Sequence, residues 1–113
     1  MAGKEMKPER IAAGTDIFKE GDLGDKMYVV KEGDIDLSIN GKIVASVGKG
    51  GIFGEMALID NKPRSATAHA KTNCVLVPID EARFLDLVHQ KPSFALEVMK
   101  VLVERLRLMD TKA

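Results

Sequence analysis

Hydrophobic and polar residues alternate with a period of two in several short runs between Thr15 and Val77. In the clearest run, residues 35–39, the apolar side chains of Ile35, Leu37 and Ile39 point to one side of a strand and the polar ones to the other. Glycines interrupt these runs every few residues, which is typical of an all-β sandwich or barrel. The pattern predicts a β roll over about residues 15–78.

The alternation divides this roll into at least six strands. Asn40-Gly41 supplies the positive φ angles of a two-residue hairpin turn, so the strands on either side are predicted to be adjacent and antiparallel. Closure into a roll is expected because open sheet edges promote aggregation. The expected strands are 16–19, 26–31, 35–39, 42–47, 66–70 and 74–77.

Both ends of this region have their own pattern. Residues 1–14 form a polar lead-in, with one loose helical turn expected around Glu9 to Ala13. Residues 74–77 are continuously apolar, which predicts a strand covered on both faces.

The period changes from strand to helix at Pro78. Asp80 has the short acceptor side chain of a helix N-cap, and Pro92 starts a second helix that is expected to end near Met109. The predicted fold is therefore mainly β: a double-stranded β-helix, or jelly roll, followed by two C-terminal helices over about residues 80–110.

The second of these helices carries two apolar stripes, which together form an arc too wide for one contact face. We expect part of the arc to pack on the roll and the rest to meet another helix, from a second copy of the chain or from a partner protein. A small domain that simply leaves some leucine exposed explains the arc equally well. One stripe comprises Ala95, Val98, Leu102, Leu106 and Met109, and the other Phe94, Val101 and Leu108.

Composition fits a single domain over residues 1–113, because a domain usually has about 100 to 200 residues. The 17 basic and 17 acidic residues cancel, which removes the bulk electrostatic argument for binding nucleic acid or an anionic membrane. A lone cysteine, Cys74, favours a reducing compartment, and no apolar run approaches the ~18 residues of a membrane span or resembles a secretion signal. We expect a cytoplasmic protein that does not contact a membrane.

The segment from Gly48 to Thr67 carries the candidate chemistry. It has four glycines in seven residues, then good helix formers from Glu55, then Arg64 just before a strand. Glycines let backbone N–H groups converge on an anion, and a planar guanidinium suits two phosphate oxygens. The spacing matches neither a P-loop nor a dinucleotide-binding fingerprint. These residues describe a cradle for one small phosphate.

Glu55 is the unexpected member of this segment, because a carboxylate repels a phosphate unless the two groups hold different parts of one ligand. A carboxylate accepts hydrogen bonds, so a sugar hydroxyl is its natural partner. Arg64 on a phosphodiester and Glu55 on a ribose hydroxyl would fit a cyclic mononucleotide. On residue types alone, a surface ion pair between the two side chains explains them equally well.

The sequences FGEMAL at 53–58 and PRSAT at 63–67 resemble the phosphate-binding cassette of the cyclic nucleotide-binding domain family, which includes the catabolite activator protein and protein kinase A regulatory subunits. The likeness covers about residues 15–110. It implies that Glu55 and the backbone of Gly54 bind the ribose 2′-hydroxyl and that Arg64 binds the cyclic phosphate. Further residues similar to the family are Phe18, Gly21, Asp22, Gly24, Asp25, Met27, Tyr28 and Gly33.

The remaining cassette residues bear on how the ligand is held and which nucleotide it is. The resemblance implies that the backbone amides of Met56 and Ala57 help to bind the phosphate. Ser65 favours cyclic AMP, since the catabolite activator protein has serine at this position. A hydroxyl here could also bind a guanine amino group, so cyclic GMP stays open. No metal or other cofactor is expected, because His69 and His89 lack metal-ligand spacing.

The resemblance to the catabolite activator protein extends to the last helix, where that protein has an arginine matching Arg105 that approaches the cassette glutamate. A contact of Arg105 with Glu55 is therefore favoured over a solvated Arg105 balanced by Glu104. Only residues 110–113 follow Met109, with no helix-turn-helix, so DNA binding by this chain is not expected. Ligand binding is expected to order the cassette and draw this helix over the base.

The sequence thus predicts a non-catalytic regulatory domain that senses a cyclic nucleotide, with cyclic AMP favoured. An enzyme is not indicated, because no paired nucleophile and base or metal cluster is visible. The alternative is a protein-interaction domain that has the same roll, binds no nucleotide and acts through its exposed helix.

Overall fold

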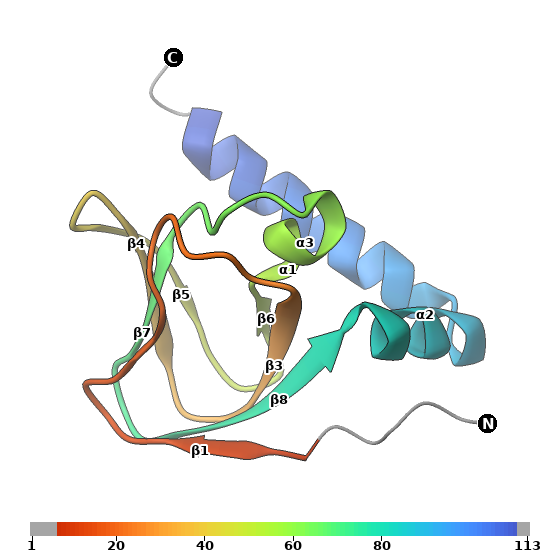
Figure 1. Ribbon diagram of the computed structural model, residues 1–113, viewed down its shortest axis with the longest axis horizontal. Helices are drawn as coiled ribbons and strands as arrows, with labels where there is room; N and C mark the ends of the chain where they lie inside the picture. The colour runs from red at the N-terminus through yellow and green to blue at the C-terminus, as the bar shows by residue number, and fades with distance from the viewer. Residues whose placement is uncertain (1–6, 111–113) are drawn as a thin grey trace.

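The computed structural model describes residues 7–110, with side chains through Leu108. Within this range the chain forms short strands first and then two longer helices, with one short helix between strands (Figure 1). The elements are β1 (Glu9–Ile11), β2 (Asp16–Phe18), β3 (Lys26–Glu32), β4 (Ile35–Ile39), β5 (Lys42–Val47), β6 (Ile52–Phe53), α1 (Glu55–Asp60), β7 (Thr67–Ala70), β8 (Cys74–Asp80), α2 (Glu81–Gln90) and α3 (Ser93–Asp110).

The strands form two four-stranded sheets, in the orders β1-β8-β3-β6 and β2-β7-β4-β5. Neighbouring strands in both sheets are antiparallel. The sheets curve around a shared interior, and the helices lie outside it (Figure 1). The predicted fold class, a jelly roll followed by two C-terminal helices, is confirmed.

The predicted hairpin joins β4 and β5. Asn40 and Gly41 have φ angles of 51° and 79°, as a two-residue turn with the twist of the strands requires. Ile35 and Leu37 are buried, whereas Asp36 between them is only half-buried and accepts a hydrogen bond from Ser46. The alternation of residues 35–39 therefore assigned the inner face of this strand correctly.

The helical turn predicted around Glu9 to Ala13 is wrong. Residues 9–11 form β1, in which Glu9 pairs with Leu76 and Ile11 with Cys74. Three residues are too few to show a period, so the segment becomes a strand only because β8 offers it a free edge. The roll accordingly begins before residue 15, and the rest of the lead-in, residues 1–6, lies outside the described range.

Strand β8 also differs from expectation. Val75 and Val77 are half-buried while Cys74 and Leu76 are buried, so the strand is fully covered on one face only. It continues through Pro78 to Asp80. Proline has no N–H to donate and is tolerated here because Pro78 lies beyond the residues that pair with β1.

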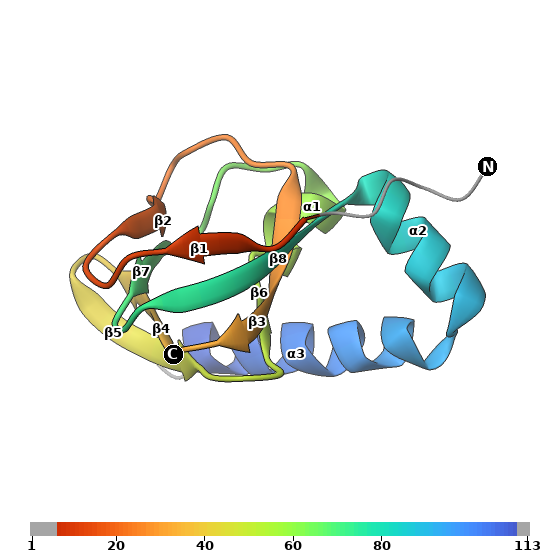
Figure 2. The ribbon, with the colours of Figure 1, turned by 90° about the horizontal axis from the view of Figure 1, so that it is seen from below.

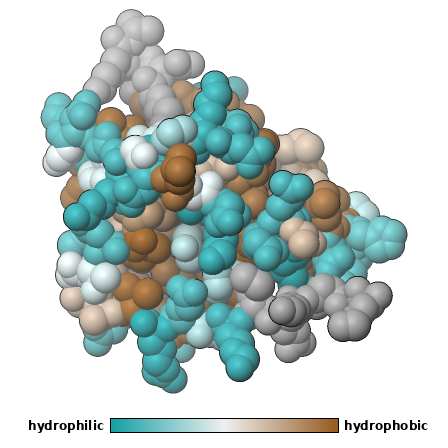
Figure 3. All heavy atoms as spheres, in the orientation of Figure 1, coloured by the Kyte–Doolittle hydropathy of each residue, from teal (hydrophilic) through white to brown (hydrophobic). Residues whose placement is uncertain are grey.

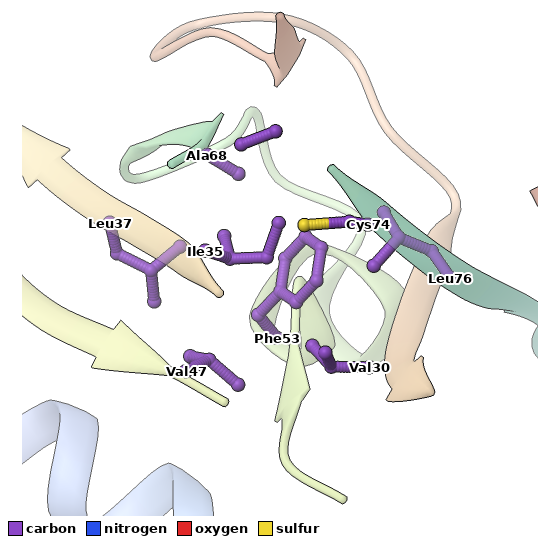
Figure 4. Close-up of a cluster of buried hydrophobic side chains, with 9 residues drawn as sticks. Val30, Ile35, Leu37, Val47, Phe53, Ala68, Cys74 and Leu76 are labelled. Carbon is purple, nitrogen blue, oxygen red and sulfur yellow. The ribbon is translucent and has the colours of Figure 1, made fainter. Parts of the chain in front are cut away.

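A compact apolar cluster, the roll core, fills the interior between the sheets. Phe53 is fully buried at its centre, with side chains of both sheets around it (Figure 4). Burying one such side chain contributes roughly 1.5 to 3 kcal/mol. The members of the roll core are Val30, Ile35, Leu37, Val47, Phe53, Ala68, Ala70, Cys74 and Leu76.

A second cluster, the helix core, joins the helices to the roll. Asp80 caps α2 by accepting a hydrogen bond from the amide of Arg83 at 2.8 Å, as predicted. Helix α3 then runs along one side of the roll (Figure 2). The buried members of the helix core are Met27, Ile52, Leu58, Ile79 and Val98, and half-buried residues around them are Val29, Phe84, Leu87, Phe94, Val101 and Leu102.

Helix α3 divides its apolar residues differently from the two predicted stripes. Phe94 and Val101 join Val98 and Leu102 on the packed face, whereas Leu106 is half exposed. The exposed apolar residues of α3 include Leu96, Met99, Val103 and Leu106, which we call the outer seam. The side chain of Met109, predicted to lie in one stripe with Val98 and Leu102, is not among the described side chains.

The surface seen in Figure 3 is mainly hydrophilic, with hydrophobic side chains at several separate places. Within residues 7–110, no helix is both long and apolar enough to cross a membrane. The same range holds no group of three His, Cys, Asp or Glu side chains that could bind a metal ion.

Candidate functional site

The turn from β6 into α1 positions the cassette. Gly54 caps α1 with φ 80° and ψ 6°, a left-handed conformation that favours glycine. A Cβ atom here would lie 2.9 Å from Nη1 of Arg64 and 3.2 Å from the carbonyl oxygen of Lys26. Glycine is therefore required twice, for the backbone angle and for the approach of Arg64.

Arg64 is buried, with 6% of its surface exposed. Its Nη1 donates to the carbonyl of Gly54 at 3.0 Å and its Nη2 to the carbonyl of Lys26 at 2.8 Å, while its buried Nε has no hydrogen-bond partner. Burial lowers the pKa of the guanidinium from its ordinary value, opposed by Tyr28 and by nearby carboxylates. A buried guanidinium with an unused donor is suited to bind an anion.

Glu55, the first residue of α1, is 2% exposed. Its Oε1 is buried and accepts no hydrogen bond. Burial raises the pKa of its carboxyl, opposed by its own backbone amide and by the charges of Arg105 and Arg64. A buried acceptor without a partner is costly, so this oxygen is available for a hydroxyl donor.

A surface ion pair between Glu55 and Arg64 is excluded by this geometry. Both side chains are buried, and the hydrogen bonds of Arg64 go to backbone carbonyls. The favoured contact of Arg105 with Glu55 is also wrong. Nη2 of Arg105 donates to the carbonyl of Ile52 at 2.8 Å, and its buried Nε has no hydrogen-bond partner.

The other predicted site residues lie around the same pocket. Ala57 is buried in α1, and Met56 beside it is half-buried. Ser65 is exposed, and its hydroxyl donates to Sδ of Met56 at 3.7 Å. All six predicted residues therefore come together at one place, although the structure itself assigns them no ligand.

The site pocket opens between α1, the sheet of β4 and β5, and α3. It is a cavity of about 50 Å³, room for a few water molecules. One wall is polar or charged and the other apolar, a division that suits a ligand with a charged end and a flat apolar part. The lining residues are Phe18, Leu37, Ile39, Val44, Gly54, Glu55, Met56, Ala57, Arg64, Ser65, Ala66, Arg105 and Leu108.

Sequence reasoning about the chemistry left several of these residues unassigned. Leu37, Ile39 and Val44 come from the β4–β5 hairpin, and the alternation marked them only as strand residues. The resemblance includes Phe18 but implies no role for it, and in the structure its ring centroid lies 4.0 Å from Cζ of Arg64. Only the folded arrangement brings these segments to the cassette.

A family model described as the cyclic nucleotide-binding domain matches residues 8–91, most of the chain. The chain belongs to the cyclic nucleotide-binding domain family. A cAMP-dependent protein kinase regulatory subunit from Eremothecium gossypii is 38% identical over 79 residues, which is 70% of this chain and 17% of that protein. The domain thus spans about a sixth of the length of this curated relative.

Solved structures support the same assignment. The catabolite activator protein of Thermus thermophilus superposes with a TM-score of 0.81 at 32% identity, over 95% of this chain and 53% of that chain. The EAL enzyme Bd1971 superposes in a cAMP-bound form with a TM-score of 0.70 and in a cGMP-bound form with 0.71. Each Bd1971 comparison has 33% identity and covers 89% of this chain and 28% of the enzyme.

Proposed function

We propose that this domain binds a cyclic nucleotide in the site pocket. The observation that carries the proposal is that three residues lining one cavity each have a buried side-chain atom without a hydrogen-bond partner: Oε1 of Glu55, Nε of Arg64 and Nε of Arg105. Buried polar atoms in folded proteins are normally satisfied. A ligand that brings an anion and a hydroxyl group would satisfy both kinds of atom.

The ligand is oriented by these groups. Arg64 binds the cyclic phosphate, assisted by the backbone amides of Met56 and Ala57, and Glu55 accepts a hydrogen bond from the ribose 2′-hydroxyl beside Gly54. The apolar residues of the β4–β5 hairpin then face the base. Binding through a buried carboxylate and a buried guanidinium gives specificity because a ligand that lacks either group leaves a buried charge unpaired.

Cyclic AMP is the preferred nucleotide in this proposal, with cyclic GMP as the competitor. The hydroxyl of Ser65 donates to Sδ of Met56, and its oxygen can still accept a hydrogen bond from a guanine amino group, so Ser65 alone does not decide the preference. The matched relative is a cAMP-dependent protein kinase regulatory subunit, while Bd1971 has been solved with either nucleotide. Comparing the two affinities directly decides the preference.

The role is regulatory and not catalytic. The titratable side chains that line the pocket are one carboxyl and two guanidinium groups, with no His, Cys or Lys among the lining residues. Hydrolysis of the cyclic phosphate would need a positioned base or a metal-bound water. The lining instead favours binding and release of an unchanged ligand.

Calorimetric titration with cyclic AMP and cyclic GMP tests the proposal. Arg64→Ala should weaken binding by about 2 to 5 kcal/mol, roughly thirty-fold to several thousand-fold, because the phosphate loses its charged partner. Arg83→Ala on α2 is the matched control and should bind like the parent protein. The proposal is wrong if neither nucleotide binds the parent protein at millimolar concentration, or if Arg64→Ala binds with parental affinity.

The outer seam of α3 supports a second candidate, a protein-interaction domain. Leu96, Met99, Val103 and Leu106 are 54%, 57%, 47% and 50% exposed and are spaced as one continuous helix face. Such a face suits a second copy of the chain or a partner helix. The two candidates are separated by the same titration, since an interaction domain without nucleotide binding gives no heat with either ligand.

A further inference from the structure

The loop between β2 and β3 holds the main chain of Arg64. The amide of Arg64 donates to the carbonyl of Asp22 at 2.8 Å, and the amide of Gly21 donates to the carbonyl of Arg64 at 2.9 Å. This reciprocal pair of hydrogen bonds fixes the end of the cassette to a loop about 40 residues earlier in the chain. The position of the Arg64 Cα atom is thus set from outside the cassette.

The ring of Phe18 contacts the guanidinium of Arg64. Cζ of Arg64 lies 4.0 Å from the ring centroid, within the range of an attractive cation–π contact. The ring is itself held by Tyr28 and Phe53, with centroid distances of 6.3 Å and 5.9 Å. Phe53 is fully buried in the roll core, so the platform under the guanidinium is anchored in the interior.

Gly24 leaves the space that the guanidinium occupies. A Cβ atom at this position would lie 2.2 Å from Nε, 2.5 Å from Cζ and 2.6 Å from Nη2 of Arg64. Gly24 does not have a positive φ angle, so its backbone conformation does not itself require glycine. The close approach to Arg64 is therefore the reason that a side chain is not accommodated here.

We infer that Phe18 and Gly24 are positioning residues for Arg64. Phe18 fixes the plane of the guanidinium, and Gly24 lets it lie where Nη1 and Nη2 reach two backbone carbonyls while Nε stays unpaired. A guanidinium held before the ligand arrives loses little side-chain entropy on binding. The inference rests on the proposed nucleotide function and extends it by assigning phosphate affinity partly to residues outside the cassette.

Substitution of Phe18 tests the platform. Phe18→Leu should weaken cyclic AMP binding by about three- to thirty-fold, the strength of a partly to fully desolvated cation–π contact. Phe18→Tyr keeps a ring and should restore affinity to within about two-fold of the parent protein. Phe84→Leu is the matched control, because Phe84 packs on Phe94 in the helix core, away from the pocket lining. Melting temperatures of all variants identify losses that come from unfolding.

Substitution of Gly24 tests whether the Arg64 guanidinium needs the space that a side chain at this position would fill. Gly24→Ala should weaken binding at least about ten-fold, because the added methyl group displaces the guanidinium. In an Arg64→Gln background, neither Gly24→Ala nor Phe18→Leu should cause a further loss, since their effects pass through Arg64. A full additional loss in that background would show that both residues act on the ligand or on folding independently of Arg64, which overturns the inference.

Nuclear magnetic resonance of the Arg64 Nε–H group gives a readout that needs no ligand. A ring 4.0 Å from Cζ should shift this resonance upfield in the parent protein and in Phe18→Tyr, and the shift should disappear in Phe18→Leu. An unchanged resonance in Phe18→Leu overturns the inference even if nucleotide binds. If the parent protein binds no nucleotide, the proposed function fails, and the resonance alone decides the positioning role.

Discussion

A buried carboxyl with an unpaired oxygen lowers the stability of the protein that contains it. Glu55 is 2% exposed, and the two arginines near it are engaged with backbone carbonyls, so neither neutralises its charge at contact distance. Burial therefore raises the pKa of its carboxyl. The folded state therefore favours the protonated carboxyl. Relative to neutral pH, Glu55 stabilises the fold below its unfolded pKa, and this contribution is lost as pH rises through the folded pKa.

Glu55→Gln should accordingly raise stability and lower affinity. The neutral amide removes the cost of an ionised buried carboxyl, so unfolding at neutral pH should need on the order of 1 kcal/mol more, and the gain should shrink toward acid pH. Cyclic AMP affinity should fall about ten-fold, because a hydrogen bond to a charged acceptor is replaced by a weaker one. Urea unfolding across pH 4 to 8 and calorimetry measure the two effects.

Glu32→Gln at the exposed end of β3 is the control and should change neither quantity. In the parent protein, nucleotide affinity should also fall as pH drops through the raised pKa of Glu55. A Glu55→Gln protein that is less stable than the parent at neutral pH would show that the carboxylate is better satisfied than its surroundings indicate.

The sequence predicted which side chains lie at the candidate site, but not which atoms they contact. Glu55 and Arg64 stand out because a carboxylate and a guanidinium both follow a glycine-rich turn. The partner of Arg105, a backbone carbonyl at Ile52, could not be predicted, because every residue offers the same acceptor. The contact of Phe18 with Arg64 was equally hidden, since it depends on how the β2–β3 loop crosses the cassette.

At the scale of elements, periodicity was reliable wherever a segment had enough residues to express it. Strands β4 and β5, their hairpin and both long helices follow from the pattern. Strand β1 did not, because its three residues become a strand only by pairing with β8. The pattern predicts the end of a strand at Pro78, yet β8 continues through it, beyond the residues that pair with β1.

Helix α3 has an outer seam with the 3-4-3 spacing of a two-stranded coiled coil. We expect the seam to pair with a second copy of the chain. Val103→Glu or Leu106→Glu should then raise the dimer dissociation constant at least about ten-fold, because each places a charge in an apolar interface. Sedimentation equilibrium from micromolar to several hundred micromolar protein measures this constant.

Glu104→Lys is the control for the seam. It changes a charge on an exposed position of α3 next to the seam and should leave the dissociation constant nearly unchanged. A parent protein that stays monomeric over the whole concentration range rules out self-association and leaves the seam for a different partner.

At the scale of the whole molecule, two apolar clusters stabilise different parts of the fold. The roll core holds the sheets together, and the helix core joins α1, α2 and α3 to the roll. Leu58 of α1 and Val98 of α3 lie in the same helix core, and Nη2 of Arg105 is bonded to Ile52, three residues before Glu55. The cassette and α3 are thus physically connected by packing and by one charged hydrogen bond.

The lining of the site pocket includes residues of α3. Arg105 and Leu108 of α3 are part of this lining. A ligand bound in the pocket would therefore contact α3, and Arg105 of α3 is hydrogen-bonded to Ile52, directly before the cassette. We therefore expect nucleotide binding to shift α3 between two arrangements, to an extent limited by the difference in affinity between them.

Hydrogen exchange measures that shift. Saturating cyclic AMP should change the exchange rates of α3 amides around residues 101–108 by about five-fold or more, the range of a typical coupling free energy. Arg105→Met keeps the apolar stem but loses the bond to Ile52, so it should speed exchange in α3 without ligand and reduce the response to ligand. Arg107→Met, one position past the seam on the same helix, is exposed and should respond like the parent protein. Identical α3 exchange with and without nucleotide, in a parent protein that calorimetry shows to be saturated, would contradict this expectation and show that α3 does not respond to the ligand.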